Sequence, residues 1–184
     1  MLAFDIDDRK MEEIATEFAA TPKQVEMAYK RAMTRTAGTL RRLATSGLKS
    51  ELGLRNTQAL RRRIKEYRLK GRSGTGVKLW FGVNDLPLSA FKGRPQRVAD
   101  GVRFGDTVIK GAFIARRGGK RGVYRRLTDK AFPIDEARMP VSDRMMIYLE
   151  DQVFVDLDTI FFKNFAAEIR ARTIFGVGEN ARYS

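Results

Sequence analysis

The 184-residue chain has 43% hydrophobic residues, enough to build a core, and a formal net charge of +14. It contains neither cysteine nor histidine, which excludes disulfides, thiolate nucleophiles, Cys/His zinc sites and histidine acid–base catalysis. The catalytic arrangements that remain possible are carboxylate pairs, a Ser-Lys arrangement and a carboxylate-bound cation, but the sequence shows no recognisable spacing for any of them. We therefore expect no enzyme activity and no cofactor.

Membrane insertion and secretion are not expected either. The sequence has no apolar run long enough to span a bilayer. Its N-terminus is acidic where a signal peptide would be basic.

Charge is unevenly distributed along the chain. Residues 1–20 contain 2 Lys or Arg against 6 Asp or Glu, residues 21–126 contain 27 against 6, and residues 127–184 contain 7 against 10. A basic block between two acidic ends could screen nucleic-acid phosphates, face an acidic partner, or bind the acidic ends of a neighbouring copy.

The first part of the chain predicts two helices. Asp7 or Asp8 can cap a short amphipathic helix, and Thr21-Pro-Lys-Gln24 is typical of a capping box with proline at the first helical position. The second helix is predicted to run from Pro22 to about Leu52 and to end at Gly53.

Residues 60–83 predict a change from helix to strand. Leu60, Ile64 and Tyr67 follow helical spacing, which predicts a basic helix over 60–70 that Asn56 or Thr57 can cap. The glycines of 71–76 predict a loop. The alternation over 77–83 predicts a strand with one face in the core, and it places Trp80 on the side opposite Val77 and Leu79.

Residues 91–101 predict a basic, mobile loop, and the next segments predict strands at 101–105, 107–115 and 123–127. The last two would form a hairpin with a basic tip at 116–121. An extended connection at 132–140 would then lead to a helical region that Ser142 caps. This region is predicted to run to about Thr173, with an interruption near 153–155. Its residues Phe162, Phe165, Ala166 and Ile169 follow helical spacing and are predicted to pack in the core.

These elements predict an α+β fold in a single domain, residues 1–184. Residues 1–70 would be mainly helical, residues 77–127 would form antiparallel strands with the basic hairpin, and residues 142–173 would form the C-terminal helix. Long N-terminal helices would thus precede a small antiparallel sheet and a C-terminal helical region.

Clustered cations are the candidate site residues, since they could contact DNA phosphates without sequence preference. A second reading is open for the tip charges, which could discourage strand-to-strand aggregation. The cations of the predicted long helix are expected to form a solvated helix face; they are Arg31, Arg35, Arg41, Arg42 and Lys49. Glu150, Asp151, Asp156 and Asp158 are expected to be helix surface rather than a metal site. The candidates are Arg61, Arg62, Arg63, Arg116, Arg117, Lys120 and Arg121.

Four segments in order give the chain its resemblance to a known family. They are Asp5-Ile-Asp-Asp-Arg-Lys-Met-Glu-Glu, Ala20-Thr-Pro-Lys-Gln-Val, Lys78-Leu-Trp-Phe-Gly-Val-Asn-Asp-Leu-Pro-Leu-Ser89, and Gly111-Ala-Phe-Ile-Ala followed by Val123-Tyr-Arg-Arg. With these segments the chain resembles the minor tail protein Z family of tailed bacteriophages and prophages over most of its length.

The resemblance implies a structural virion protein that acts as a tail completion factor at the head-proximal end of the tail, so that tail and filled capsid join. It implies an α+β fold, ring-like homo-oligomers, and other tail and neck proteins as partners, but no catalytic residues. The protein would be found in the virion and, during assembly, in the cytoplasm of the bacterial host. The alternative is a protein that binds DNA on its own, in packaging or replication; a magnesium-dependent nuclease is more distant.

Overall fold

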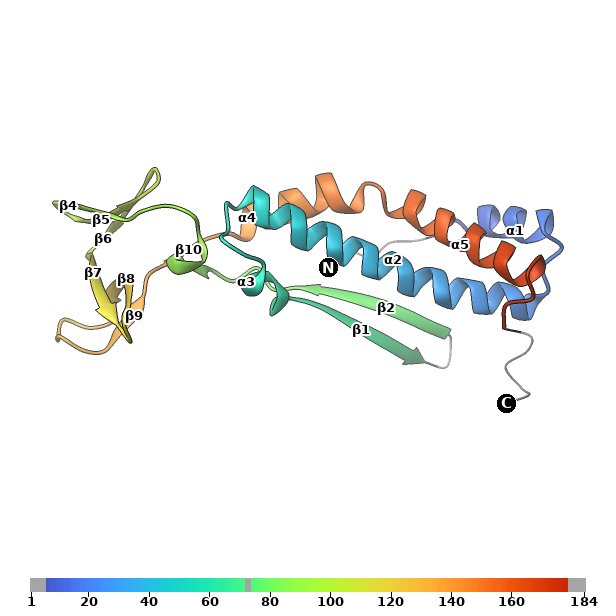
Figure 1. Cartoon of the computed structure of the whole chain (residues 1–184), viewed down its shortest axis with the longest axis horizontal. Coiled ribbons are helices and arrows are strands. Elements are labelled where there is room, and N and C mark those ends of the chain that lie inside the picture. The colour runs from blue at the N-terminus through green and yellow to red at the C-terminus, as the bar shows by residue number, and fades with distance from the viewer. Residues whose placement is uncertain (1–5, 72–73, 179–184) are drawn as a thin grey trace. The chain divides into compact units, whose positions relative to one another are not determined.

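The computed structural model describes residues 6–71 and 74–178, without the side chains of residues 68–71, 74–76 and 120. The fold is α+β, with a long N-terminal helix, small antiparallel sheets and a C-terminal helix (Figure 1). Its described residues form two compact units. Unit 1 comprises those within 1–44, 65–80 and 149–184, and unit 2 those within 45–64 and 81–148.

The two N-terminal helices begin as the sequence predicts. Asp7 caps α1 (Asp8–Glu17), because its carboxylate accepts hydrogen bonds from the backbone N–H groups of the first turn. Before α2 (Pro22–Glu51), Thr21 N–H donates to Gln24 Oε1 at 2.9 Å and Gln24 N–H donates to Thr21 Oγ1 at 3.4 Å. This reciprocal pair is the predicted capping box. Gly53, with φ of +64°, ends the helix as expected.

The core of unit 1 lies between α2 and α5 (Leu157–Thr173), and α1 packs against it. Small alanines on α2 allow close approach of aromatic side chains from α5. The Phe161 ring stacks on Phe165 with centroids 5.9 Å apart and meets Tyr29 edge-on at 5.8 Å. The buried cluster is Ala28, Ala32, Phe161, Phe162, Phe165 and Ile169.

The C-terminal helical region is interrupted where the β-branched residues predict it. After α4 (Ser142–Tyr148), residues Leu149–Phe154 form a π-helical turn (η2), and a further turn at 155–156 precedes α5. Ser142 is itself the first residue of α4, so the predicted cap lies one residue too late.

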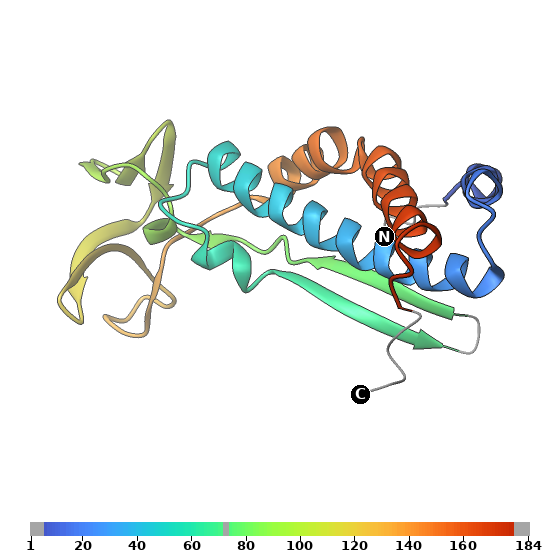
Figure 2. The same ribbon diagram turned by 45° about the vertical axis from the view of Figure 1, so that its right-hand side comes forward.

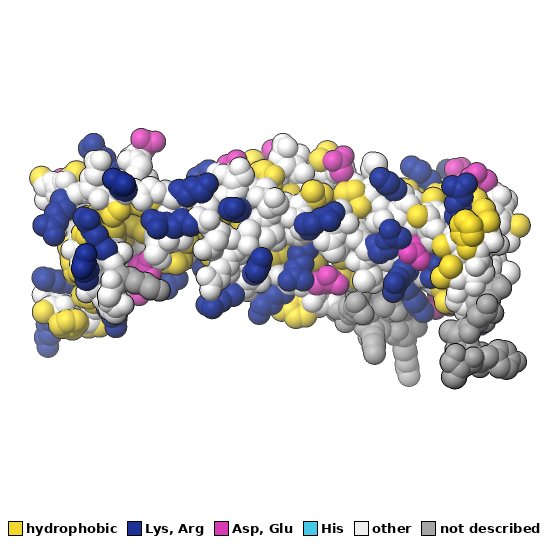
Figure 3. All heavy atoms as spheres, viewed as in Figure 1, with side chains coloured by type: hydrophobic (Ala, Val, Ile, Leu, Met, Phe, Trp, Pro, Cys, Tyr) yellow, Lys and Arg dark blue, Asp and Glu magenta, His cyan; other side chains and the backbone are white. Residues whose placement is uncertain are grey.

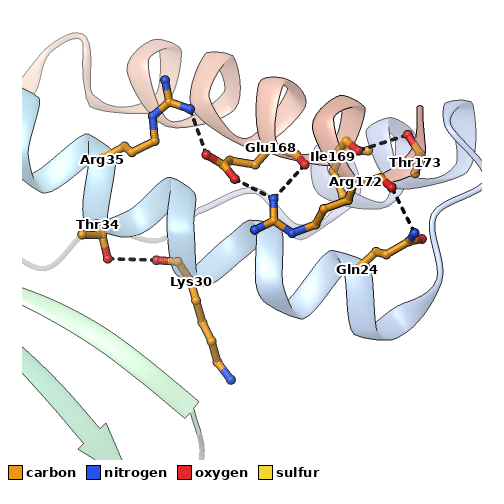
Figure 4. A network of polar contacts seen from close by, with 8 residues as sticks. All are labelled: Gln24, Lys30, Thr34, Arg35, Glu168, Ile169, Arg172 and Thr173. Atoms are coloured by element: carbon orange, nitrogen blue, oxygen red, sulfur yellow. Dashed lines mark hydrogen bonds and ion pairs between the residues drawn. The ribbon is translucent and has the colours of Figure 1, made fainter. Parts of the chain in front are cut away.

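A buried carboxylate joins α5 to α2 in unit 1 (Figure 4). Glu168 Oε2 accepts a hydrogen bond from Arg172 Nη1 at 2.5 Å, and Glu168 Oε1 accepts one from Arg35 Nη1 at 2.9 Å. Glu168 and Arg172 are 8% and 7% exposed, whereas the Arg35 side chain is 50% exposed. Burial alone would raise the pKa of Glu168, but hydrogen bonds and charges from Arg172 and Arg35 outweigh it and lower the pKa.

The predicted helix over 60–70 is wrong. Helix α3 (Gln58–Arg61) ends after one turn, and residues Ile64–Gly71 form strand β1, which pairs with β2 (Gly74–Phe81). Residues 1–70 are therefore less helical than predicted, and Gly74–Gly76 belong to a strand rather than to the predicted loop. Gly71 of that loop likewise belongs to β1, and residues 72 and 73 lie outside the described residues. Ladder hydrogen bonds with β2 outweigh the helical spacing of Leu60, Ile64 and Tyr67.

Unit 2 contains two three-stranded antiparallel sheets, in the orders β4-β5-β6 and β7-β8-β9. Two predictions here are wrong: part of the basic loop over 91–101 is strand β4, and the strand over 107–115 is divided at Gly111, whose φ is +66°. The strands are β4 (Gln96–Val98), β5 (Gly101–Phe104), β6 (Thr107–Lys110), β7 (Ala112–Arg117), β8 (Lys120–Arg126) and β9 (Ile134–Glu136).

The rest of unit 2 connects these sheets to the end of α2. Strand β3 (Leu86–Pro87) pairs with β10 (Arg138–Met139) in a two-stranded sheet, and η1 (Leu88–Ala90) packs against β8. The predicted extended connection over 132–140 thus contains β9 and β10. The strands of the described residues form four small sheets rather than the single predicted sheet. Buried apolar residues include Leu48, Leu54, Leu60, Leu86, Phe91, Val102, Val123 and Met145.

Candidate nucleic-acid interface

The predicted basic hairpin tip forms between β7 and β8. Gly118 and Gly119 make the turn with φ of +56° and +77°, a backbone conformation in which glycine avoids the strain of a Cβ atom. The strand register then places Arg116 opposite Arg121 and Arg117 opposite Lys120. The structure therefore brings together the four tip cations that the sequence singles out.

The register sets like charges directly opposite each other. Side chains at opposite positions of an antiparallel pair share a face, with Cβ atoms about 5 Å apart, so each pair of cations repels. Arg116, Arg117 and Arg121 are exposed, and no ion pair among the described residues includes them. The side chain of Lys120 lies outside the described part. An anion bound at the tip would relieve this repulsion.

A buried base supports the tip. Strand β9 pairs with β8 on the side away from β7, and Tyr124 and Val123 of β8 are buried. The Phe113 and Tyr124 rings lie 6.4 Å apart, and the Arg126 guanidinium lies 5.6 Å from the centroid of Phe113. The tip is thus held by a three-stranded sheet rather than by an isolated hairpin.

The second candidate group, at the end of α3, is divided by the structure. Arg61 and Arg62 are exposed and remain available to a ligand. Arg63 instead donates hydrogen bonds to the backbone carbonyls of Asn84 and Asp85. Burial and, secondly, the charge of Arg138 lower the pKa of Arg63, and Asp85 opposes this shift. Arg63 therefore connects α3 to the segment after β2 and is a poor candidate for phosphate contact.

The Arg63→Ala protein is expected to lose about 1–2 kcal/mol of unfolding free energy, because two charge-assisted hydrogen bonds to carbonyls disappear. Arg62→Ala removes the same charge from an exposed neighbour and should leave stability unchanged. Urea denaturation of both variants measures the difference. Equal stability of the two variants would contradict the structural role of Arg63.

The structure does not join the two candidate groups. No hydrogen bond or ion pair within the described ranges connects Arg61–Arg63 to the hairpin tip, and Figure 1 shows α3 well apart from β7 and β8 within unit 2. Phosphate contact by all of the predicted residues would therefore require two separate sites.

Sequence reasoning missed further exposed cations of unit 2. The full sequence of this unit has 19 Lys or Arg against 8 Asp or Glu, a net charge of +11. Figure 3 shows Lys and Arg side chains over the strands β4–β9 on the face in view. The sequence reading singled out only the densest groups of cations, so it passed over these more widely spaced residues. The missed residues are Arg94, Arg97, Arg103, Lys110 and Arg125.

The acidic residues of the C-terminal region form no candidate metal site. Glu150, Asp151, Asp156 and Asp158 are all exposed, and Asp156 lies in the turn before α5 rather than on a helix surface. Within residues 6–71 and 74–178, no group of three or more carboxylates is arranged to hold a metal ion. In the same ranges, no helix is long and apolar enough to cross a membrane.

Comparison of the chain with models of protein families, with curated proteins and with solved structures gives no significant match.

Proposed function

We propose that the chain is a structural protein of a phage virion, a minor tail or tail completion component at the head-proximal end of the tail. It supports head–tail joining and forms a homo-oligomeric ring that contacts other tail and neck proteins. It resides in the virion after assembly in the bacterial cytoplasm. The resemblance to the minor tail protein Z family supports this role, and the α+β fold is compatible with it.

The observation that carries the proposal is the set of cations that the strand register places opposite one another across the β7–β8 hairpin. Arg116 faces Arg121, and Arg117 faces Lys120, at the end of a supported sheet in a unit of net charge +11. A ring at the neck surrounds the path of DNA, whose phosphates would neutralise such a tip without reading sequence. In this role the hairpin faces the channel.

Light scattering of the purified protein tests the proposal, with and without double-stranded DNA, at low and physiological salt. The expected result is a discrete oligomer whose affinity for DNA is weak at physiological salt. In a phage that carries the gene, deletion should leave tails and DNA-filled heads unjoined. Addition of the purified protein to such an extract should restore infectious particles.

A second candidate is a non-sequence-specific DNA-binding protein acting in packaging or replication, which the same hairpin cations favour. A monomer that binds DNA tightly, with a steep salt dependence, would replace the first proposal by the second. Normal head–tail joining without the protein would likewise contradict the tail completion role.

A further inference from the structure

The β1–β2 hairpin of unit 1 presents an aromatic and basic surface. Its side chains alternate, so Val77 and Leu79 are half-buried while Lys65, Tyr67, Lys78 and Trp80 are exposed. We call these four residues the outer face. Tyr67 is 46% and Trp80 is 42% exposed, and Lys65 Nζ lies 5.8 Å from the Trp80 ring centroid.

This surface is typical of a protein interface. In the described part of the chain, the hairpin is a two-stranded sheet without a third strand. Two-stranded hairpins gain stability when a further surface covers them, and Trp and Tyr are enriched among residues that dominate binding energy. Neither Lys65 nor Lys78 takes part in an ion pair of the described residues.

A complementary surface lies on α1 of the same unit. Glu12, Glu13 and Glu17 are exposed and share one side of the helix with Arg9. None of the three carboxylates has an ion pair among the described residues. Glu13 and Glu17 lie one turn apart, and Glu17 is the last residue of the helix, which has no basic residue in its last turn. Mutual repulsion and the helix dipole both disfavour this arrangement unless cations approach.

The two surfaces do not meet within one copy. In Figures 1 and 2 helix α2 lies between α1 and the β1–β2 hairpin in both views. We propose that the outer face of one copy docks on the acidic side of α1 of a second copy, an inference that rests on the proposed ring. Such a head-to-tail contact uses two different surfaces, so each copy binds two neighbours and the chain of copies can close.

Nucleic acid is the competing occupant of the outer face. Single-stranded nucleic acid would stack its bases on exposed aromatic rings. Lys65, however, lies over the Trp80 ring where a base would stack. Double-stranded DNA offers phosphates but no free base faces, so its bases would not stack on the rings of Tyr67 and Trp80. Charge complementarity with Glu12, Glu13 and Glu17 therefore favours the second copy.

Charge reversal of each surface tests the docking in the full-length protein. One variant carries Lys65→Glu and Lys78→Glu, and the other carries Glu12→Lys, Glu13→Lys and Glu17→Lys. Each alone is expected to fall to the monomer mass of 20.9 kDa in light scattering, because like charges face each other. An equimolar mixture should recover the oligomer, since both junctions of an alternating ring are again complementary. Recovery also demonstrates that both variants are folded.

A variant with Lys92→Glu and Lys163→Glu is the matched control, because both lysines are exposed and lie outside the two surfaces. It should keep the wild-type mass. A wild-type oligomer that survives both reversals, or a mixture that stays monomeric, overturns the docking alone and leaves the ring standing. A monomeric wild type overturns the docking together with the ring. Loss of binding to a fluorescent oligothymidylate in the hairpin variant, at unchanged mass, would assign the outer face to nucleic acid instead.

Discussion

The Glu168→Gln protein is expected to lose about 3 kcal/mol of unfolding free energy at neutral pH, because Arg172 then keeps a buried charge without a counter-ion. Arg172 is only 7% exposed, and its Nε atom already has no hydrogen-bond partner in the described part of the structure. Arg35 is half-exposed, so water compensates for most of the loss of its ion pair with Glu168. The glutamine has nearly the shape of Glu168, which isolates the effect of charge.

The same substitution should alter the pH dependence of stability. The pKa of Glu168 is lower in the folded protein than the ordinary carboxyl value of 4.5. The contribution of ionised Glu168 to the unfolding free energy is therefore complete above about pH 4.5. This contribution is lost as the pH falls through the lowered pKa that Glu168 has in the folded protein. The glutamine side chain of the variant does not titrate, so the difference between wild type and variant should shrink in this acid range.

Urea denaturation at neutral pH and at a series of acidic pH values measures both effects. Glu26→Gln is the matched control, because the pair of Glu26 with Lys30 lies on the surface of α2. That variant should resemble the wild type at neutral pH, since exposed pairs contribute little. If Glu168→Gln costs no more than Glu26→Gln, the buried ion pair has no role in stability.

Neutralising the hairpin tip should weaken DNA binding while making the hairpin more stable. Changing Arg116, Arg117, Lys120 and Arg121 to Gln would remove up to four of the proposed phosphate contacts. The slope of log affinity against log salt should then fall by about 3–4, and affinity at physiological salt should fall on the order of a hundredfold. Relief of cross-strand repulsion should raise the unfolding free energy by about 0.2–1 kcal/mol for each pair.

Fluorescence anisotropy with duplex DNA at several salt concentrations measures the binding. The matched control changes four exposed cations of unit 1 to Gln, namely Arg31, Arg42, Lys163 and Arg170, and so removes the same net charge. It should reduce the slope much less than the tip variant does. Equal losses would mean that net charge alone governs binding, and unchanged binding in the tip variant would remove the tip from the interface.

Local chemistry explains which elements could be predicted. The capping residues Asp7, Thr21 and Gln24 act within one helical turn, so their spacing in sequence is their spacing in structure. The Gly118-Gly119 turn is local in the same sense, and it places the four tip cations within reach of one another. Strand β1 was missed because Leu60, Ile64 and Tyr67 have helical spacing, while pairing with β2 depends on residues beyond the segment.

The sequence alone therefore determined the α+β class, the long helix, the interrupted C-terminal helix and the basic hairpin, since each depends on neighbouring residues. Only the tertiary structure decided the partners of individual charges. Arg63 meets two backbone carbonyls, and Glu168 meets Arg35 from α2, a residue far away in sequence. Whether a charge binds a ligand or holds the fold depends on what burial and chain topology place beside it, and periodicity carries no information about that.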